Sequence, residues 1–104
     1  MAAPYNPPVK GEDFKIRISL EDMSNPGSFK ASPTIAAGDF QVDIDGGGYS
    51  NLGTLPTVSP AASVSVLVTI SSFEMNGDVI TLKCIDQTLP KEWTDLVISI
   101  PTTQ

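Results

Sequence analysis

The carboxylates are the side chains of this sequence most able to do chemistry. The 104-residue chain holds twelve Asp and Glu residues, one Cys and no His. Without His it lacks a His general base, a Ser-His-Asp or Cys-His nucleophile and an imidazole ligand for zinc. Cys84 alone cannot form a disulfide within the chain or a thiolate metal cage. Any catalysis or metal binding would therefore fall to the carboxylates.

A run of acids before a glycine cluster raises the question of a calcium site. Asp39, Asp43 and Asp45 precede the three glycines at residues 46–48. A calcium loop needs several oxygens converging from one short turn, with a bidentate carboxylate further on. Asp43 and Asp45 are expected to share a strand face that points to solvent, and the next acid is Glu74. The pattern favours a soluble strand face with a hairpin turn, and we expect no metal and no cofactor.

The sequence does not support the other catalytic arrangements considered, a phosphate-binding loop and a pair of hydrolytic carboxylates. The glycine run is followed by no helix and no Lys-Ser/Thr pair, which a phosphate-binding loop requires. A pair of carboxylates for glycoside hydrolysis could be drawn from Glu74, Asp78, Asp86 or Glu92. With twelve acids some pair will always be close, and no insertion forms a cleft to hold a sugar. We expect a protein that is not an enzyme.

The overall charge limits the partners. Six Lys and Arg residues leave a formal net charge of −6 and a pI of about 4.2. This balance disfavours nucleic acid and anionic membranes, because both need a basic surface. Mean hydropathy is +0.06, and the apolar runs are far shorter than the roughly 20 residues of a membrane helix. The first ten residues lack the pattern of a secretory signal, and a lone Cys fits a reducing cytoplasm.

The elements that would position these residues show a period of two. Phe14, Ile16, Ile18 and Leu20 alternate with polar residues, which predicts a half-buried strand. The same alternation recurs in residues 40–44, 64–70, 79–85 and 96–100. Residues 39–54 predict a tight hairpin, because Asp-Gly and Gly-Gly supply the positive φ angles that short hairpin turns need. Tyr49 and Leu52 then lie on its return strand. A weaker strand is expected over residues 29–35, where Pro33 excludes a central position.

These short strands indicate an all-β fold. Turn signals recur every eight to twelve residues, and the one helical feature is a single turn with capping-box spacing from Ser71 to Glu74. We predict one Ig-like β-sandwich of about six or seven strands over residues 13–101, with a small β-barrel as the alternative. Cys84 and Trp93 are expected in its core.

The ends of the chain are expected to lie outside the sandwich. Pro4, Pro7, Pro8 and Gly11 disfavour regular structure, so residues 1–12 are predicted to form an extended arm. Residues 102–104 form a short tail. The candidate interface residues lie on the arm, and they are Tyr5, Pro7, Pro8 and Val9. A frayed terminus is the alternative interpretation of the same segment.

Several motifs in sequence order resemble small virion proteins of tailed bacteriophages. They are FKASPTIAAGDFQVDIDGGGYSNLGTLPTVSP at residues 29–60, SSFEMNGDVITLKCID at 71–86 and KEWTDLVISI at 91–100. The similarity covers residues 14–100 and includes an FK-x-x-PT-x-A-x-GDF opening, a DGG hairpin and an LP-x-V-x-P crossover. Proteins that look like this occur among capsid decoration, head-fibre and tail components. No motif belongs to a catalytic family.

The resemblance implies a structural role in a virion. We expect a capsid decoration (cement) protein that binds the outside of the head and stabilises it, after assembly in the host cytoplasm. Its partners would be the major capsid protein and copies of itself, with a trimer as one arrangement, and neither nucleic acid nor a membrane. The alternatives are a head-fibre or tail/neck component, or a β-sandwich module that binds a ligand such as a carbohydrate.

Overall fold

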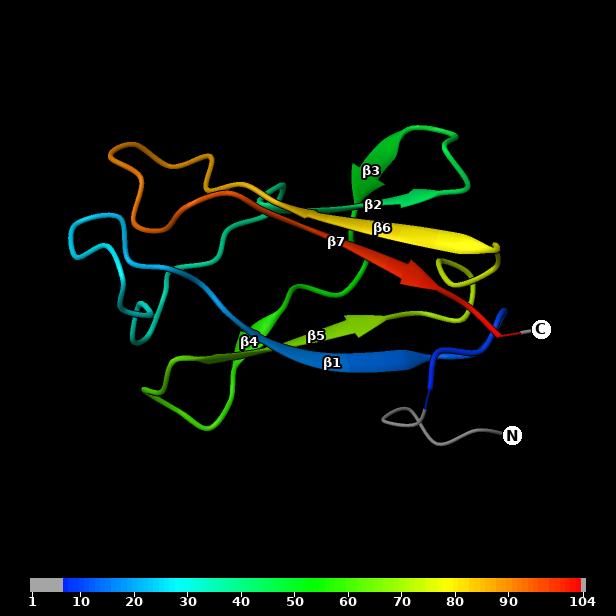
Figure 1. The fold of residues 1–104 in the computed structure, drawn as a ribbon, viewed down its shortest axis with the longest axis horizontal. Coiled ribbons are helices and arrows are strands. Elements are labelled where there is room, and N and C mark those ends of the chain that lie inside the picture. The colour runs from blue at the N-terminus through cyan, green and yellow to red at the C-terminus, as the bar shows by residue number, and fades with distance from the viewer. Residues whose placement is uncertain (1–6, 104) are drawn as a thin grey trace.

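Two antiparallel sheets pack face to face in the structure, a computed structural model that describes residues 7–103. One sheet has the order β1 (Phe14–Ser19), β5 (Ser65–Ile70), β4 (Thr57–Val58). The other has the order β3 (Tyr49–Asn51), β2 (Phe40–Ile44), β6 (Val79–Cys84), β7 (Leu96–Pro101). Figure 1 shows the two layers one above the other. The predicted all-β sandwich is confirmed.

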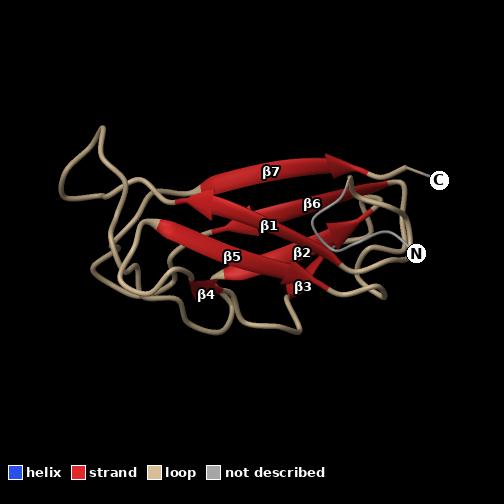
Figure 2. Ribbon diagram, turned by 90° about the horizontal axis from the view of Figure 1, so that it is seen from below, coloured by secondary structure: helices blue, strands red, loops and turns tan. Residues whose placement is uncertain are grey.

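The sandwich is open at its sides, so the alternative of a closed barrel is excluded. β1 ends one sheet and β7 ends the other, and the two strands are not paired. Figure 2 shows both of these edge strands on the same side of the molecule. The strand expected over residues 29–35 does not form. Only a single bridge joins Phe29 to Glu21, and Ser32 has a φ of 48°, which interrupts an extended backbone before Pro33.

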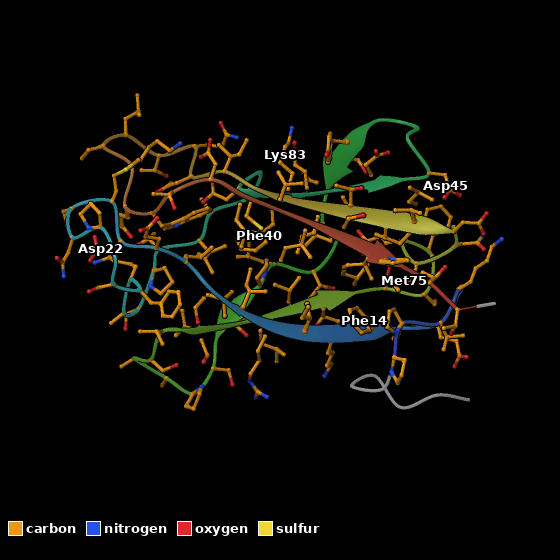
Figure 3. The ribbon with its side chains drawn as sticks, in the orientation of Figure 1. Phe14, Asp22, Phe40, Asp45, Met75 and Lys83 are labelled. Atoms are coloured by element: carbon orange, nitrogen blue, oxygen red, sulfur yellow. The ribbon has the colours of Figure 1, made fainter. Side chains whose placement is uncertain are left out.

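The core lies between the sheets and follows the predicted alternation. Val66, Val68 and Ile70 of β5 are fully buried and face Ile80 and Leu82 of β6. Figure 3 shows that Phe14, Phe40 and Met75 also point into this space. Trp93 is buried as expected, with its ring centroid 5.9 Å from that of Phe40 and its Nε1 donating to the carbonyl of Thr34. Burial of each large apolar side chain contributes about 1.5–3 kcal/mol.

The hairpin between β2 and β3 has the predicted turn chemistry. Asp45 and Gly46 adopt φ angles of 54° and 81°, and the N–H of Gly47 donates to the carbonyl of Ile44 at 3.0 Å. Two successive positive φ angles match the twist of paired strands. After β3 the N–H of Leu52 still donates to the carbonyl of Phe40. The prediction of a tight hairpin in residues 39–54 is confirmed.

The predicted capping box also forms, in a turn that does not continue as a helix. The Glu74 carboxylate accepts hydrogen bonds from the N–H and hydroxyl of Ser71, both at 3.0 Å. Ser71 Oγ in turn accepts from the N–H of Glu74. The other Glu74 oxygen accepts from the N–H of Gly53 at 2.9 Å. One residue therefore joins the β5–β6 turn to the loop after β3.

The N-terminal segment is attached to the sandwich earlier than the expected end of the arm at residue 12. The N–H of Thr103 donates to the carbonyl of Pro8, and that of Lys10 donates back to Thr103, both within 2.9 Å. Val9 thus forms a parallel bridge with Thr103. The N–H of Gly11 donates to Met75. Prolines remove donors only at their own positions, so the residues after Pro8 remain free to make these bonds.

Candidate functional site

Asp39, the most buried of the acids, holds two loops together. It is 1% exposed and lies just before β2. One carboxylate oxygen accepts from the N–H of Ala36 at 2.9 Å, and the other accepts from the N–H of Gln87 at 3.0 Å. Its own carbonyl accepts from the N–H of Ile85. The side chain therefore fixes the segment before β2 against the segment after β6.

Asp86 has the same kind of role within the β6–β7 loop. Its carboxylate accepts from the N–H groups of Thr88 and Glu92, at 3.0 and 2.7 Å. Glu92 then accepts from the N–H of Thr34 at 2.9 Å. Of the four acids that could have formed a hydrolytic pair, Glu74, Asp86 and Glu92 are thus hydrogen-bonded to loop backbone, whereas Asp78 pairs with Lys10. Their positions define loop shape.

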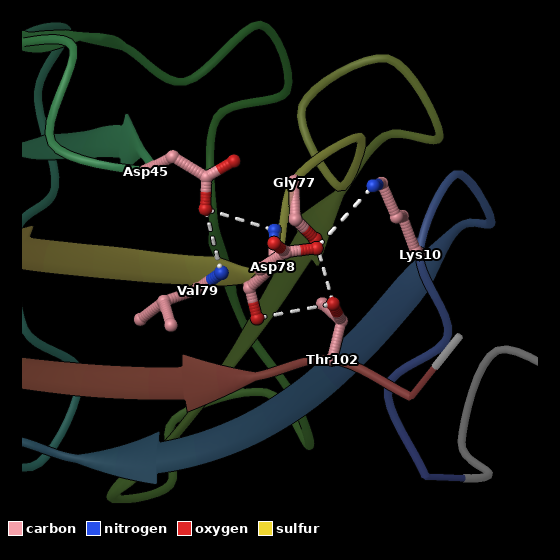
Figure 4. Close-up of polar contacts among 6 residues, drawn as sticks. All are labelled: Lys10, Asp45, Gly77, Asp78, Val79 and Thr102. Atoms are coloured by element: carbon pink, nitrogen blue, oxygen red, sulfur yellow. Dashed lines mark hydrogen bonds and ion pairs between the residues drawn. The ribbon is translucent and has the colours of Figure 1, made fainter.

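Asp45 departs from the expectation that it would point to solvent from a strand face. One oxygen accepts from the N–H groups of Asp78 and Val79, at 2.8 and 2.9 Å (Figure 4). The reason is that Asp45 has left the strand for the positive-φ position of the turn, which redirects its side chain. Lys10 pairs with Asp78 at 3.3 Å, and Thr102 donates to the carbonyl of Gly77 at 2.6 Å. The cluster ties both ends of the described chain to the β2–β3 hairpin.

Two further observations bear on metal and thiol chemistry. Within residues 7–103, no group of three or more His, Cys, Asp or Glu side chains could hold a metal ion. Burial raises the pKa of the Cys84 thiol to about 12. At neutral pH this thiol is therefore protonated and enclosed, as expected for a core residue.

Three of the exposed large apolar side chains lie at the end of the sandwich farthest from Val9 and Thr103. We call this the loop end and define it by Met23, Phe29 and Leu89. Their exposed fractions are 41%, 60% and 83%. They come from the β1–β2 and β6–β7 loops, which extend together beyond the sheets in Figure 1. Large apolar side chains that stay this exposed are typical of contact surfaces.

The two loops of the loop end support each other. The N–H of Met23 donates to the carbonyl of Glu92, and the N–H of Thr94 donates to the carbonyl of Glu21, at 2.9 and 3.0 Å. Hydrogen bonds from the hydroxyl and N–H of Ser24 lower the pKa of Asp22, which Figure 3 labels at this end. The apolar side chains are therefore carried on a braced loop pair.

Two shallow hollows flank the loop end. One, of about 360 Å³, lies between the end of β1 and the start of β7, and Leu20, Phe29 and Leu96 line it. The other, of about 400 Å³, is lined by Leu89 together with charged side chains of both signs, including Lys30 and Lys91. The surface thus combines protruding apolar groups with adjoining depressions, which suits contact with another protein.

The interface residues predicted from sequence lie elsewhere. Tyr5 falls outside the described residues. Pro7 is exposed, and Pro8 and Val9 are half-buried beside Thr103, at the opposite end from Leu89. Sequence reasoning missed the loop end, although a signal was present. Phe29 and Leu89 are large apolar residues that stand beside turn residues.

Trp93 and Tyr49, the candidate sugar-stacking residues within the described part of the chain, both make other contacts. Trp93 is buried in the core. The amine of Lys83 lies 4.1 Å from the ring centroid of Tyr49 on the outer face of the four-stranded sheet. A sugar that stacked on this face of the ring would have to displace the cation.

Comparison of the chain with protein-family models, curated proteins and solved structures gives no match. No helix in the described part of the chain has the length and apolar character to cross a bilayer.

Proposed function

We propose that this protein is a non-enzymatic structural protein of a bacteriophage virion, which decorates the outside of the capsid and stabilises it. The observation that carries the proposal is the loop end, where Met23, Phe29 and Leu89 are exposed on braced loops. Such a surface can dock on a shell subunit, because burying apolar area is the main favourable term in association. The motif resemblance to phage virion proteins supplies the shell as partner.

The electrostatics of the chain fit this role. A net charge of −6 keeps the free protein soluble before it docks. The carboxylates of Asp39 and Asp86 accept hydrogen bonds from loop backbone and so shape the loops. The proposal assigns the major capsid protein as the partner of the loop end.

A binding assay with matched variants tests the docking surface. We expect a variant carrying Phe29→Ser and Leu89→Ser to lose at least about tenfold in affinity for capsids of the phage that encodes the chain, which corresponds to about 1.4 kcal/mol. Phe73→Ser is the control, because Phe73 is 82% exposed and lies in the β5–β6 turn at the other end. Equal binding by the two variants would refute the assignment of the loop end.

The copy number in purified virions tests the role itself. Decoration predicts on the order of hundreds of copies on the head, because every symmetric site is filled. A count of about six or twelve would place the protein in the tail or neck instead. Absence from the particle would overturn the proposal altogether.

A further inference from the structure

The two edge strands on one side of the sandwich differ in their protection against strand pairing. β1 carries Lys15 and Arg17 on its outer face, and charges of this kind discourage the approach of another strand. β7, with the sequence LVISIP, carries no charge over six residues. Val97 on its outer face is 57% exposed. Of the two edges, β7 is the one that can accept a partner.

The backbone of β7 has donors and acceptors that point away from the sheet. The N–H of Thr102 donates to Asp78, on the β6 side, whereas Thr103 bonds outward to Pro8 and Lys10. Because successive residues of a strand present their backbone groups to alternate sides, Val97 and Ser99 also point outward. No other described strand lies beside them. This edge therefore offers two N–H groups and their carbonyls.

The core is incompletely covered along the same edge. Ile98 on the inner face of β7 is half-buried, as are Ile16 and Ile18 of β1 in the facing sheet. The corresponding residues of the central strands, such as Val68 and Leu82, are fully buried. The hollow of about 360 Å³ described above lies at the end of this incompletely covered edge, beside Leu96. A strand added to β7 would cover these apolar side chains.

The chain's own N-terminal segment cannot extend its existing bridge along this edge. To extend the parallel bridge of Val9 with Thr103 by one step along β7, the N–H groups of Pro101 and Pro8 would have to donate hydrogen bonds. Proline has no N–H group, so this step cannot form. In this register the ladder stops at Thr103, so it does not reach the N–H groups of Val97 and Ser99.

We propose that β7 pairs antiparallel with β7 of a second copy, so that the two four-stranded sheets join into one continuous sheet across a two-fold axis. With Ile98 opposite Ile98 of the second copy, Val97 of each copy lies opposite Ser99 of the other copy. Each Val97 and each Ser99 then donates and accepts one hydrogen bond, and every outward N–H of the strand is used. The Ile98 side chains meet over the exposed part of the core.

The absence of charged side chains along β7 favours a second copy over a basic foreign protein as the occupant. The chain has a net charge of −6, so a foreign partner steered to it would be basic. A basic partner finds no carboxylate within Leu96–Pro101 to pair with. In the two-fold register no charged side chain of one β7 faces a charged side chain of the other, so like charges do not oppose pairing here. The pairing of the two β7 strands needs no capsid and forms between free copies of the protein.

Sedimentation of the free protein tests the pairing. We expect the full chain to shift from monomer to dimer with a Kd tighter than about 1 mM, which corresponds to about 4.1 kcal/mol. Ser99→Pro removes one outward N–H and leaves the bonds to β6 in place, so this variant should remain monomeric. Ser99→Ala keeps the N–H and should associate like the parent. A parent that stays monomeric to about 1 mM, or equal association by both variants, would overturn the proposal.

Amide exchange gives a second measurement that needs no variant. Protection of the Val97 and Ser99 amides should rise with protein concentration if a second copy covers them. Protection that is independent of concentration would show that the chain covers its own edge, and fast exchange at all concentrations would show an uncovered edge. Either result contradicts the pairing. Neither affects the capsid-binding assay, so the two proposals fail separately.

Discussion

Replacement of Asp39 by Asn would remove one charge-assisted hydrogen bond from the interior without changing the size of the side chain. The two carboxylate oxygens accept from two different N–H groups, those of Ala36 and Gln87. Asn has one oxygen and one NH₂ group, so one of these donors would face another donor. At 1% exposure water cannot supply the missing acceptor.

The expected cost follows from that single lost bond. A hydrogen bond to a charged group contributes about 1.5–3 kcal/mol, and the N–H left without an acceptor is a buried polar group. For a domain of this length, such a loss lowers the melting temperature by about 6–24 °C. Thermal unfolding followed by circular dichroism measures it directly.

Asp43→Asn is the matched control in the same strand region. Asp43 accepts a single hydrogen bond, from the N–H of Gly48 at 3.0 Å, and the amide oxygen of Asn can replace that acceptor. We expect a change within about 0.5 kcal/mol for this control. If Asp39→Asn melts at the same temperature as Asp43→Asn, the buried carboxylate does not hold the loops as argued.

Three further predictions concern packing and ionisation. Gly77→Ala should lower the free energy of unfolding in urea by about 1–3 kcal/mol, because the new Cβ would lie 2.5 Å from Ile44 Cγ2. Gly53→Ala is the control and should be close to neutral, since its Cβ would lie 3.8 Å from the nearest atom. Equal stabilities of the two variants would contradict the clash. The Cys84 thiol should resist alkylation at pH 8 until the protein unfolds, and rapid labelling of the folded protein would contradict its burial. The pKa of the Cys84 thiol is raised to about 12 in the folded state, against 9.0 ordinarily. The unfolded state therefore loses the proton first, and the free energy of unfolding should fall as pH rises from about 9 to 12. Cys84→Ala should lack that part of the slope.

Periodicity was sufficient to predict the sandwich and much of its core. Apolar residues occupy every second position of β5 and β6, with Leu67 and Val79 as additional apolar residues on the outer face, and burial in the structure follows the period of two. The Asp45-Gly46 turn and the Ser71–Glu74 capping box were also predictable, because each depends on residues close in sequence. Local chemistry therefore accounts for the elements and their turns.

Contacts between segments far apart in the chain could not be predicted from the sequence. Asp45 reaches the backbone of Val79, and Met23 is bonded to Glu92, at separations that no period or turn motif encodes. The loop end depends on two such loops meeting in space. The bridge between Val9 and Thr103 likewise joins opposite ends of the chain, which is why a proline-rich segment was expected to lie wholly outside the fold.

The bridge between Val9 and Thr103 gives the molecule a polarity. Both residues lie at one end, and the loop end lies at the other (Figure 1). The described chain therefore enters the fold at Val9 and leaves it at Thr103 at the same end, away from Phe29 and Leu89. A short peptide linking these two positions would close the backbone into a ring, and the ring could be reopened at the β2–β3 turn. A cargo domain attached at Val9 or Thr103 would lie away from whatever surface the loop end contacts, which makes this architecture a natural display scaffold.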